Sequence, residues 1–275
     1  MIDILFTAFL LSVVLVGIHS YFGLEIIKRG IIFTDLAIGQ MAAFGAAISL
    51  LFFDGSFIYL ISLSFAIVAA IFIAYSTKRS PYPEAIIGLL YAFSLSAVYI
   101  ALSKTYHGME EFQRLLASDI LFTPLHKIIE TAVIYSVIGI ALFALHRNIK
   151  NNGVKNILFF VLFAITVTSS VKLAGVLIVF ALLLSPAMLA LSLHAKHPLI
   201  IAWIAGTVIN IISICLSYRF DLPTGYTLVA VHTLTAMSTG IIPINQSKGW
   251  KRNIKKVALK SKKITLDYIL DERYK

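Results

Sequence analysis

Apolar runs of about 20 residues recur along the whole chain, and they constrain its fold more than any other feature. A run of this length crosses a hydrocarbon core of about 30 Å as an α-helix. Hydrophobic residues make up 59% of the 275 residues and charged residues only 13%, whereas soluble domains carry about 25% charged residues. A transmembrane barrel would instead show alternating segments of about 10 residues. The sequence therefore predicts an all-α polytopic membrane protein.

Nine apolar segments can be delimited, and because the sixth is short, eight membrane spans are an alternative. The segments cover residues 3–22, 33–53, 57–76, 84–103, 129–146, 155–170, 173–193, 199–218 and 225–244. We expect a transmembrane domain over residues 1–246 and a basic tail over 247–275. The first run follows Met1 and Ile2 with no basic segment before it, so we expect it to stay in the mature protein. The single cysteine, Cys215, lies in an apolar run and indicates no disulfide.

The distribution of charge gives an orientation for these spans. The tail from Lys248 onward holds ten basic residues and three acidic ones. With nine spans, the loops on the side of the tail hold eight basic residues and the opposite loops hold five. Because basic residues concentrate in cytoplasmic loops, the tail is expected in the cytoplasm, near anionic lipid. No aromatic and basic module favours nucleic-acid binding.

The stretch from Leu173 to Pro198 (LAGVLIVFALLLSPAMLALSLHAKHP) is the most distinctive segment. A proline inside an apolar helix removes a backbone hydrogen bond and crowds the preceding turn. We therefore expect the helix to break at Ser185 and Pro186 and to restart as a short turn that presents a polar elbow at one water interface. The alternative is an ordinary kinked span that ends in a loop.

Ionisable groups inside membrane spans are costly and suggest function. In the second segment, Asp35 and Gln40 are the polar groups beside a face of small residues. They either line a polar path, or Asp35 simply opens a helix, where the macrodipole favours a carboxylate, on a face that packs against another helix. Helix-start placement also explains Glu84, which follows two prolines.

Two histidines, His19 and His232, lie within the first and last segments. Together with Asp35 they can form a transient site of nitrogen and oxygen ligands for a divalent cation. A lone buried histidine is more often a hydrogen-bonded packing residue, so this alternative stays open.

The connection from Lys104 to Ile128 has apolar residues at helical spacing. This pattern favours an amphipathic helix on the outer surface, which either receives a partner or packs as a surface or re-entrant helix. The chain lacks a phosphate-loop motif, a His-Glu-x-x-His motif and a paired cysteine motif. Active transport would therefore draw its energy from another chain or from an ion gradient.

Three stretches resemble the permease subunits of metal-ion ABC importers, the ABC-3 type that carries zinc, manganese or iron. They are GLEIIKRGIIFTDLAIGQMAAFG (residues 23–45), EAIIGLLYAFSLSAVYIALS (residues 84–103) and LAGVLIVFALLLSPAMLALSL (residues 173–193), followed by DLPTG at residues 221–225. The resemblance implies a homodimeric pore in the bacterial cytoplasmic (inner) membrane, two ATP-binding cassette subunits and an extracytoplasmic metal-binding protein. It implies a transporter subunit and not an enzyme, with no permanent cofactor and with ATP bound by the partner chain.

The resemblance also assigns a role to the elbow. It would be the coupling helix that contacts the ATPase during alternating access. The residues expected in this contact are Pro186, Ala187, Met188, His194, Lys196 and His197.

The sequence departs from the family at the second helix, where many members carry an Asp and a His four residues apart. Aligned on Asp35, the position of the His is Gly39; aligned on Gly45, the two positions are Leu36 and Gln40. The chain thus looks like a Gln-bearing variant. Because carboxylate and amide oxygens are harder ligands than imidazole, this variant favours Mn²⁺ or Fe²⁺, or else provides a weaker passage site. The rival function is a stand-alone secondary carrier or an intramembrane enzyme that uses His19, Asp35 and His232.

Overall fold

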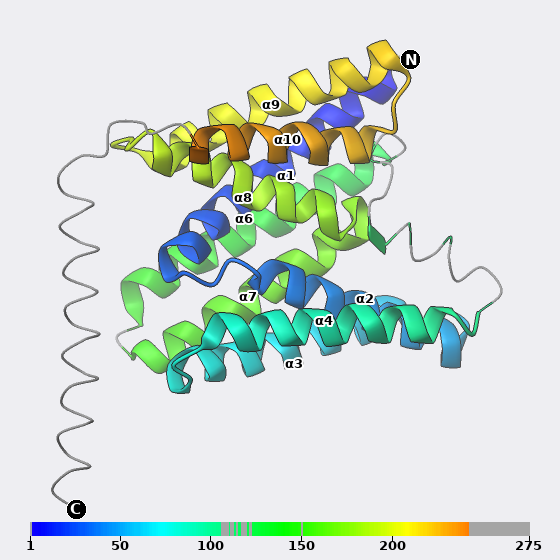
Figure 1. Ribbon diagram of the computed structural model, residues 1–275, viewed down its shortest axis with the longest axis vertical. Helices are drawn as coiled ribbons and strands as arrows, with labels where there is room; N and C mark the ends of the chain where they lie inside the picture. The colour runs from blue at the N-terminus through cyan, green and yellow to red at the C-terminus, as the bar shows by residue number, and fades with distance from the viewer. Residues whose placement is uncertain are drawn as a thin grey trace, which may run out of the picture.

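The computed structural model describes residues 2–105, 110, 113, 115, 116, 120, 123–149 and 151–241, and this part of the chain is helical with no β-strand. Its helices are α1 (Ile2–Arg29), α2 (Thr34–Phe53), α3 (Ile58–Arg79), α4 (Pro83–Leu102), α6 (Leu125–Asn148), α7 (Asn152–Ala174), α8 (Val176–Ser192), α9 (Pro198–Phe220) and α10 (Thr224–Ile241) (Figure 1). Each predicted apolar segment coincides with one of these helices, so the all-α polytopic class is confirmed.

The lengths of the helices differ from the prediction at two places. Seven helices, α1 to α4, α6, α7 and α9, are long and apolar enough to cross a membrane. The sixth segment, expected to be short, is the complete 23-residue helix α7, because polar residues from Asn152 onward add a first turn that hydropathy alone does not include. The short apolar helix is instead α8, with 17 residues, which begins only after Gly175 at φ +87°.

The predicted break at Ser185 and Pro186 is wrong. Helix α8 runs without interruption from Val176 to Ser192 with Pro186 inside it. Pro186 is buried, and a Cβ atom at Gly206 of α9 would lie only 3.0 Å from the Pro186 Cγ atom. Packing against α9 thus holds the helix together across the proline, as neighbouring helices do for proline in membrane helices.

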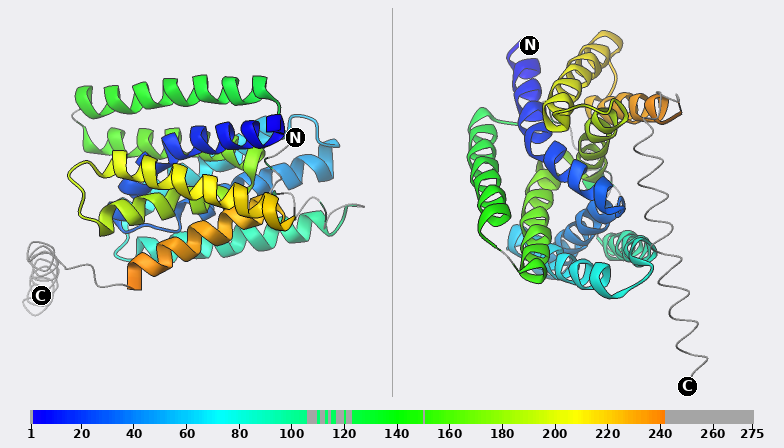
Figure 2. Two further views of the ribbon diagram at one scale, coloured as in Figure 1. Left: turned by 90° about the horizontal axis from the view of Figure 1, so that it is seen from above. Right: turned by 90° about the vertical axis from the view of Figure 1, so that its left-hand side faces the viewer.

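The helices form two connected groups (Figures 1 and 2). Helix α2 packs against α3 and α4, while α1 and α10 pack against α8 and α9. Helix α7 contacts both α3 and α6. Helix α6 lies at the edge of the bundle, where it also contacts α1. Helices α7 and α8 also both contact α2, so the second apolar segment of the chain lies where the two groups meet.

Close approach between α1 and α8 requires a glycine. A Cβ atom at Gly23 would lie 2.0 Å from the carbonyl oxygen of Leu183 and 3.0 Å from the Cβ atom of Ala187. Such small-residue contacts are how membrane helices gain van der Waals packing when lipid tails are as apolar as their own side chains. The adjoining aromatic cluster of Phe22, Phe159 and Phe163 fills the space between α1 and α7.

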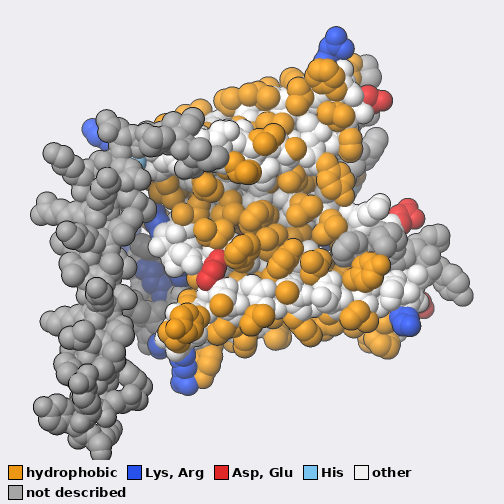
Figure 3. All heavy atoms as spheres, viewed as in Figure 1, with side chains coloured by type: hydrophobic (Ala, Val, Ile, Leu, Met, Phe, Trp, Pro, Cys, Tyr) orange, Lys and Arg blue, Asp and Glu red, His pale blue; other side chains and the backbone are white. Residues whose placement is uncertain are grey.

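Large apolar side chains cover the outer surface, and charged side chains gather toward the two ends of the helices (Figure 3). The end where α1 and α3 finish and α2, α4, α7 and α9 start is called the basic end here. Its described basic residues are Lys28, Arg29, Lys78, Arg79, Arg147, Lys155 and Lys196. An apolar exterior with a polar interior at Asp35, His19 and His232 is the pattern of a protein surrounded by lipid.

Two predictions fall outside the described residues. The amphipathic helix expected between Lys104 and Ile128 lies mostly in residues that the structure does not describe, and so does the basic tail over 247–275.

Candidate functional site: the start of helix α2

Asp35 lies in the first turn of α2 and is 1% exposed. Neither of its carboxylate oxygens has a hydrogen-bond partner among the described residues. Placement at a helix N-terminus gives the carboxylate a favourable macrodipole, but a buried charge without hydrogen bonds is costly. Within the described part of the chain, burial of this side chain is therefore not compensated by any hydrogen bond.

Glu84, from the first turn of α4, reaches the same helix start. Its Oε1 atom accepts a hydrogen bond of 3.1 Å from the backbone N–H of Phe33, the N-cap residue of α2. Its Oε2 atom is buried and has no hydrogen-bond partner within the described part of the chain. The sequence explained Glu84 by the start of its own helix, and missed that the carboxylate caps a second one. Two acidic side chains thus serve the N-terminus of α2.

Gln40 is buried on the same helix, 2% exposed, but it does not share the face of Asp35. Five residues along an α-helix correspond to a rotation of about 140°. The position on the face of Asp35 is Gly39, whose Cβ atom would meet side chains of Val167, Val171 and Val176 on α7 and α8 at 3.3–3.6 Å. The structure buries both predicted path residues, and it points them in different directions.

The two intramembrane histidines lie in separate polar contacts. The Nδ1 atom of His19 is 2.8 Å from the carbonyl oxygen of Leu15, and its ring meets Tyr135 edge-on with centroids 6.2 Å apart. The Nε2 atom of His232 is 2.8 Å from the Oδ1 atom of Asn210 on α9. Among the described residues, no three His, Cys, Asp or Glu side chains are grouped so that they could hold a metal ion. His19, Asp35 and His232 therefore do not form one site in this chain.

Asn210 is a functional candidate that the sequence reading missed. It is fully buried in α9, and its Nδ2 atom has no hydrogen-bond partner within the described residues. The indication was present in the sequence, since an amide side chain inside an apolar run is expensive unless it is paired. Its partner, His232, lies 22 residues further along the chain. Only the fold shows that the two side chains meet.

The connection between α8 and α9 provides an exposed polar surface at the basic end. Leu193 ends α8, His194 adopts a left-handed conformation at φ +50°, and α9 begins at Pro198. His194, Lys196 and His197 are exposed. Of the other residues predicted to contact a partner, Pro186 and Ala187 are buried inside the subunit and Met188 is partly buried. Of the six residues predicted to contact a partner, the structure exposes His194, Lys196 and His197.

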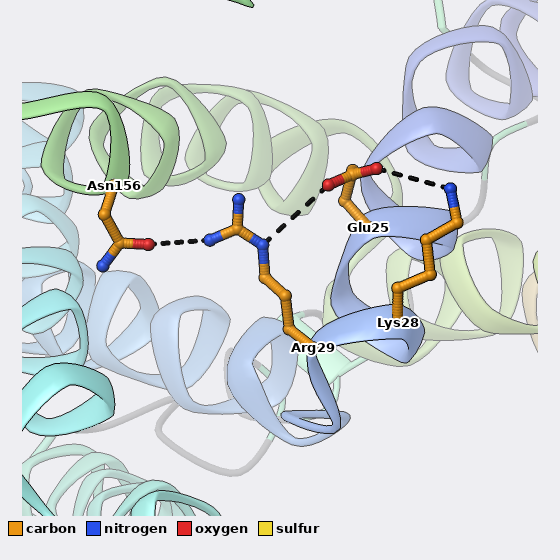
Figure 4. A network of polar contacts seen from close by, with 4 residues as sticks. All are labelled: Glu25, Lys28, Arg29 and Asn156. Atoms are coloured by element: carbon orange, nitrogen blue, oxygen red, sulfur yellow. Dashed lines mark hydrogen bonds and ion pairs between the residues drawn. The ribbon is translucent and has the colours of Figure 1, made fainter. Parts of the chain in front are cut away.

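A network of polar contacts at the basic end joins α1 to α7 (Figure 4), and a further hydrogen bond joins α7 to α3. The Nη1 atom of Arg29 donates a hydrogen bond of 2.7 Å to the Oδ1 atom of Asn156, whose Nδ2 atom donates to the carbonyl oxygen of Ala74. The guanidinium also lies over the Phe159 ring, 4.0 Å from its centroid. Arg29 thus joins α1 to α7, and Asn156 joins α7 to α3. The sequence indicated basic residues here but not these partners.

These features define a polytopic helical membrane protein with ionisable side chains buried inside its bundle, a combination typical of transporters. The chain belongs to the ABC 3 transport family, whose model matches residues 1–242. This confirms the resemblance read from the three sequence stretches.

Curated relatives and solved structures agree with this assignment. The manganese transport system membrane protein MntC of Listeria monocytogenes is 29% identical over 244 residues, covering 82% of this chain and 86% of that protein. A probable iron transport system membrane protein of Haemophilus influenzae is 25% identical over 252 residues, covering 84% of this chain and 87% of that protein.

Among solved structures, PsaBC from Streptococcus pneumoniae in complex with a Fab has a TM-score of 0.68 at 20% identity. The match covers 88% of this chain and 92% of that chain. An inward-facing structure of a metal-chelate type ABC transporter has a TM-score of 0.60 at 14% identity, with 84% of each chain covered. The fold is therefore that of ABC transporter permeases.

Proposed function

We propose that the protein is the transmembrane permease subunit of an ABC importer that moves Mn²⁺ or Fe²⁺ across the bacterial cytoplasmic membrane. The observation that carries this proposal is the buried carboxylate of Asp35, whose two oxygens have no partner among the described residues. Oxygen ligands suit hard divalent cations, whereas zinc prefers sites with imidazole or thiolate ligands. The relatives named for manganese and iron transport support the same choice.

The orientation of the protein in the membrane follows from the distribution of charge. The basic end faces the cytoplasm, because basic residues concentrate on that side of membrane proteins, and the tail after residue 246 lies there as well. An extracytoplasmic metal-binding protein delivers the ion at the opposite end, and two permease subunits form the pore. Asp35 then lies toward the cytoplasmic end of the path, with Gln40 about one and a half turns deeper in the membrane.

Energy comes from an ATP-binding cassette subunit that docks at the basic end. Leu193 to His197 is the proposed contact, because these residues are exposed between two helices that pack on the core. ATP binding draws the two ATPase subunits together and moves α8 and α9. Since α8 contacts both α1 and α2, this motion can switch access to Asp35 from one side of the membrane to the other.

The first experiment is purification of the tagged protein from its native membranes in mild detergent, with mass spectrometry of the chains that accompany it. A stoichiometric subunit with a phosphate-loop ATPase domain is expected. Lys196→Glu reverses a charge in the proposed contact and should reduce recovery of that subunit several-fold, whereas Lys78→Glu, at another loop of the same end, is the matched control. Recovery of the permease alone, even after cross-linking, would reject the importer and favour a secondary carrier.

The second experiment identifies the ion. Vesicles containing the complete transporter are assayed for ATP-dependent uptake of ⁵⁴Mn²⁺ in competition with Fe²⁺ and Zn²⁺. Mn²⁺ or Fe²⁺ should compete at lower concentration than Zn²⁺. Preferential uptake of Zn²⁺ would contradict the assignment based on oxygen ligands while leaving the importer class intact.

A further inference from the structure

A long apolar groove lies on the outer side of the bundle, and Asp35 does not line it. Helices α1, α6 and α9 enclose a volume of about 920 Å³. Most of its lining is apolar, from Val14 and Ile18 on α1, Leu142 and Phe143 on α6 and Leu199 on α9. Phe143 is 70% exposed, so the groove is accessible from the exterior that faces the lipid.

Two glycines keep this groove open. A Cβ atom at Gly17 or at Gly139 would meet no atom within 4 Å other than its own helix. Both residues line the groove, from α1 and α6 respectively. Glycine lowers the stability of a helix interior relative to alanine. Neither glycine therefore stabilises the helix in which it lies. The side-chain space that these two residues leave empty is room for a ligand.

One end of the groove is polar and carries positive charge. Glu25 and Arg147 line that end, and Arg147 is exposed. The negative charge of Glu25 is already paired, since its oxygens lie 3.5 Å from the Nζ atom of Lys28 and 4.0 Å from the Nε atom of Arg29 (Figure 4). Because the charge of Glu25 is paired with Lys28 and Arg29, Arg147 remains as the cation of the lining that can attract an anionic group.

Two aromatic side chains, Trp203 and Tyr21, also line the groove. The Nε1 atom of Trp203 donates a hydrogen bond of 2.8 Å to the carbonyl oxygen of Gly17, which fixes the indole against α1. Tyr21 lines the groove one turn before Glu25. Tryptophan and tyrosine favour the level of the lipid headgroups, where one side is apolar and the other is wet. The groove therefore combines an apolar wall with two aromatic side chains and a charged end.

We propose that this groove binds one anionic phospholipid, with an acyl chain along α6 and the phosphate at Arg147. The lining of α6 extends from Ala132 to Arg147, a rise of about 22 Å. This length accommodates a chain from one leaflet, which is about half of the 30 Å hydrocarbon core. Basic pockets between membrane helices bind anionic headgroups. The lipid bridges α6 to α1 and α9, and it holds this edge helix in place independently of which ion is transported.

The test uses Trp203 as a reporter. The chain has two tryptophans, so a full-length Trp250→Phe variant leaves Trp203 as the only one. It is reconstituted in phosphatidylcholine vesicles that contain either brominated phosphatidylglycerol or brominated phosphatidylcholine, and fluorescence quenching gives the relative affinity of the two lipids. Phosphatidylglycerol should bind several-fold more tightly, and Arg147→Gln should lower this selectivity by about fivefold, the effect of one basic side chain near a membrane surface.

Glycine variants separate the groove from the general lipid surface. Gly139→Leu fills the groove and should abolish the selectivity. Gly88→Leu on α4 is the matched control, because a Cβ atom there also meets nothing within 4 Å but the residue lies outside the groove. Equal quenching by the two lipids in the wild-type background would overturn the proposal. Selectivity that survives both Arg147→Gln and Gly139→Leu would also overturn it. A third contrary outcome is quenching that rises when the protein is diluted into lipid, because it would show that a second copy of the chain covers Trp203.

Discussion

Arg29 and Asp35 are six residues apart at the basic end, and their surroundings are opposite. Arg29 lies on the end of α1 with three partners from the chain, namely Glu25, Asn156 and the ring of Phe159. Asp35 lies at the start of α2 with 1% exposure, and neither of its oxygens has a hydrogen-bond partner among the described residues. The fold supplies partners for the side chain of Arg29, and none of the described residues is a hydrogen-bond partner for Asp35.

The difference separates a charge that stabilises the fold from one that the proposed function explains. A charge with ring, amide and carboxylate partners holds helices together, and a loss of those partners lowers stability. A buried carboxylate without partners contributes nothing of that kind and costs free energy in the empty protein. Under the proposed function, a cation would supply the missing charge, and the cost of burying Asp35 would be offset while the ion is bound.

Asp35→Asn should give the largest effect on transport. The amide keeps the shape of the side chain but removes its charge, so ATP-dependent uptake should fall by at least about tenfold, the low end of what is lost when support of a metal site is removed. The thermal unfolding midpoint of the purified protein should not decrease, because an unpaired buried charge has been removed. Normal uptake, or a large loss of stability, would place Asp35 with Arg29 among the structural charges.

Arg29→Ala should give the largest effect on stability. It removes a charged hydrogen bond and a cation–π contact, so the free energy of unfolding should decrease by about 2–3 kcal/mol. Uptake per folded molecule should stay close to that of the wild type. Arg79→Ala is the matched control. The guanidinium of Arg79 also lies over an aromatic ring, that of Tyr75, at 4.5 Å from the centroid. That variant should lose about 1 kcal/mol or less.

Glu84 lies between the two extremes, with one oxygen paired and one unpaired. Glu84→Ala leaves the Phe33 N–H without its acceptor and should cost about 1 kcal/mol, as the loss of a helix cap does. Glu84→Gln retains an oxygen at the same place and should cost less than half of that. Denaturation of the two variants in parallel measures the contribution of the cap. A Gln variant as unstable as the Ala variant would show that the charge, and not the hydrogen bond, stabilises the start of α2.

Lys28→Ala should give the smallest effect. Lys28 pairs with Glu25 across one helical turn, and its side chain is 52% exposed. Exposed ion pairs of this kind contribute about 0.5 kcal/mol or less. The unfolding midpoint should therefore stay within experimental error of the wild type. A loss comparable to that of Arg29→Ala would mean that the basic end acts as a single network and not through Arg29 alone.

Packing decided the course of the chain where proline and glycine made the local prediction ambiguous. Pro186 predicted a break, yet α8 continues because α1 and α9 approach closely at Gly23 and Gly206 and support the helix on both sides. Gly175 carried the true boundary, with the positive φ that separates α7 from α8. Neither outcome follows from hydropathy, since both residues lie in equally apolar surroundings.

The sequence by itself determined the class, the family and the order of the described helices, while it left the number of membrane spans open between eight and nine. It could do so because lipid offers no hydrogen bonds to the backbone, and every apolar run long enough to cross must become a helix. The tertiary structure decided which polar groups are satisfied. The partners of Arg29 and of the Phe33 N–H come from residues 127 and 51 positions away, and no local pattern encodes such distances. Asp35 differs from Arg29 only because the fold brings a partner to one and none of the described residues to the other.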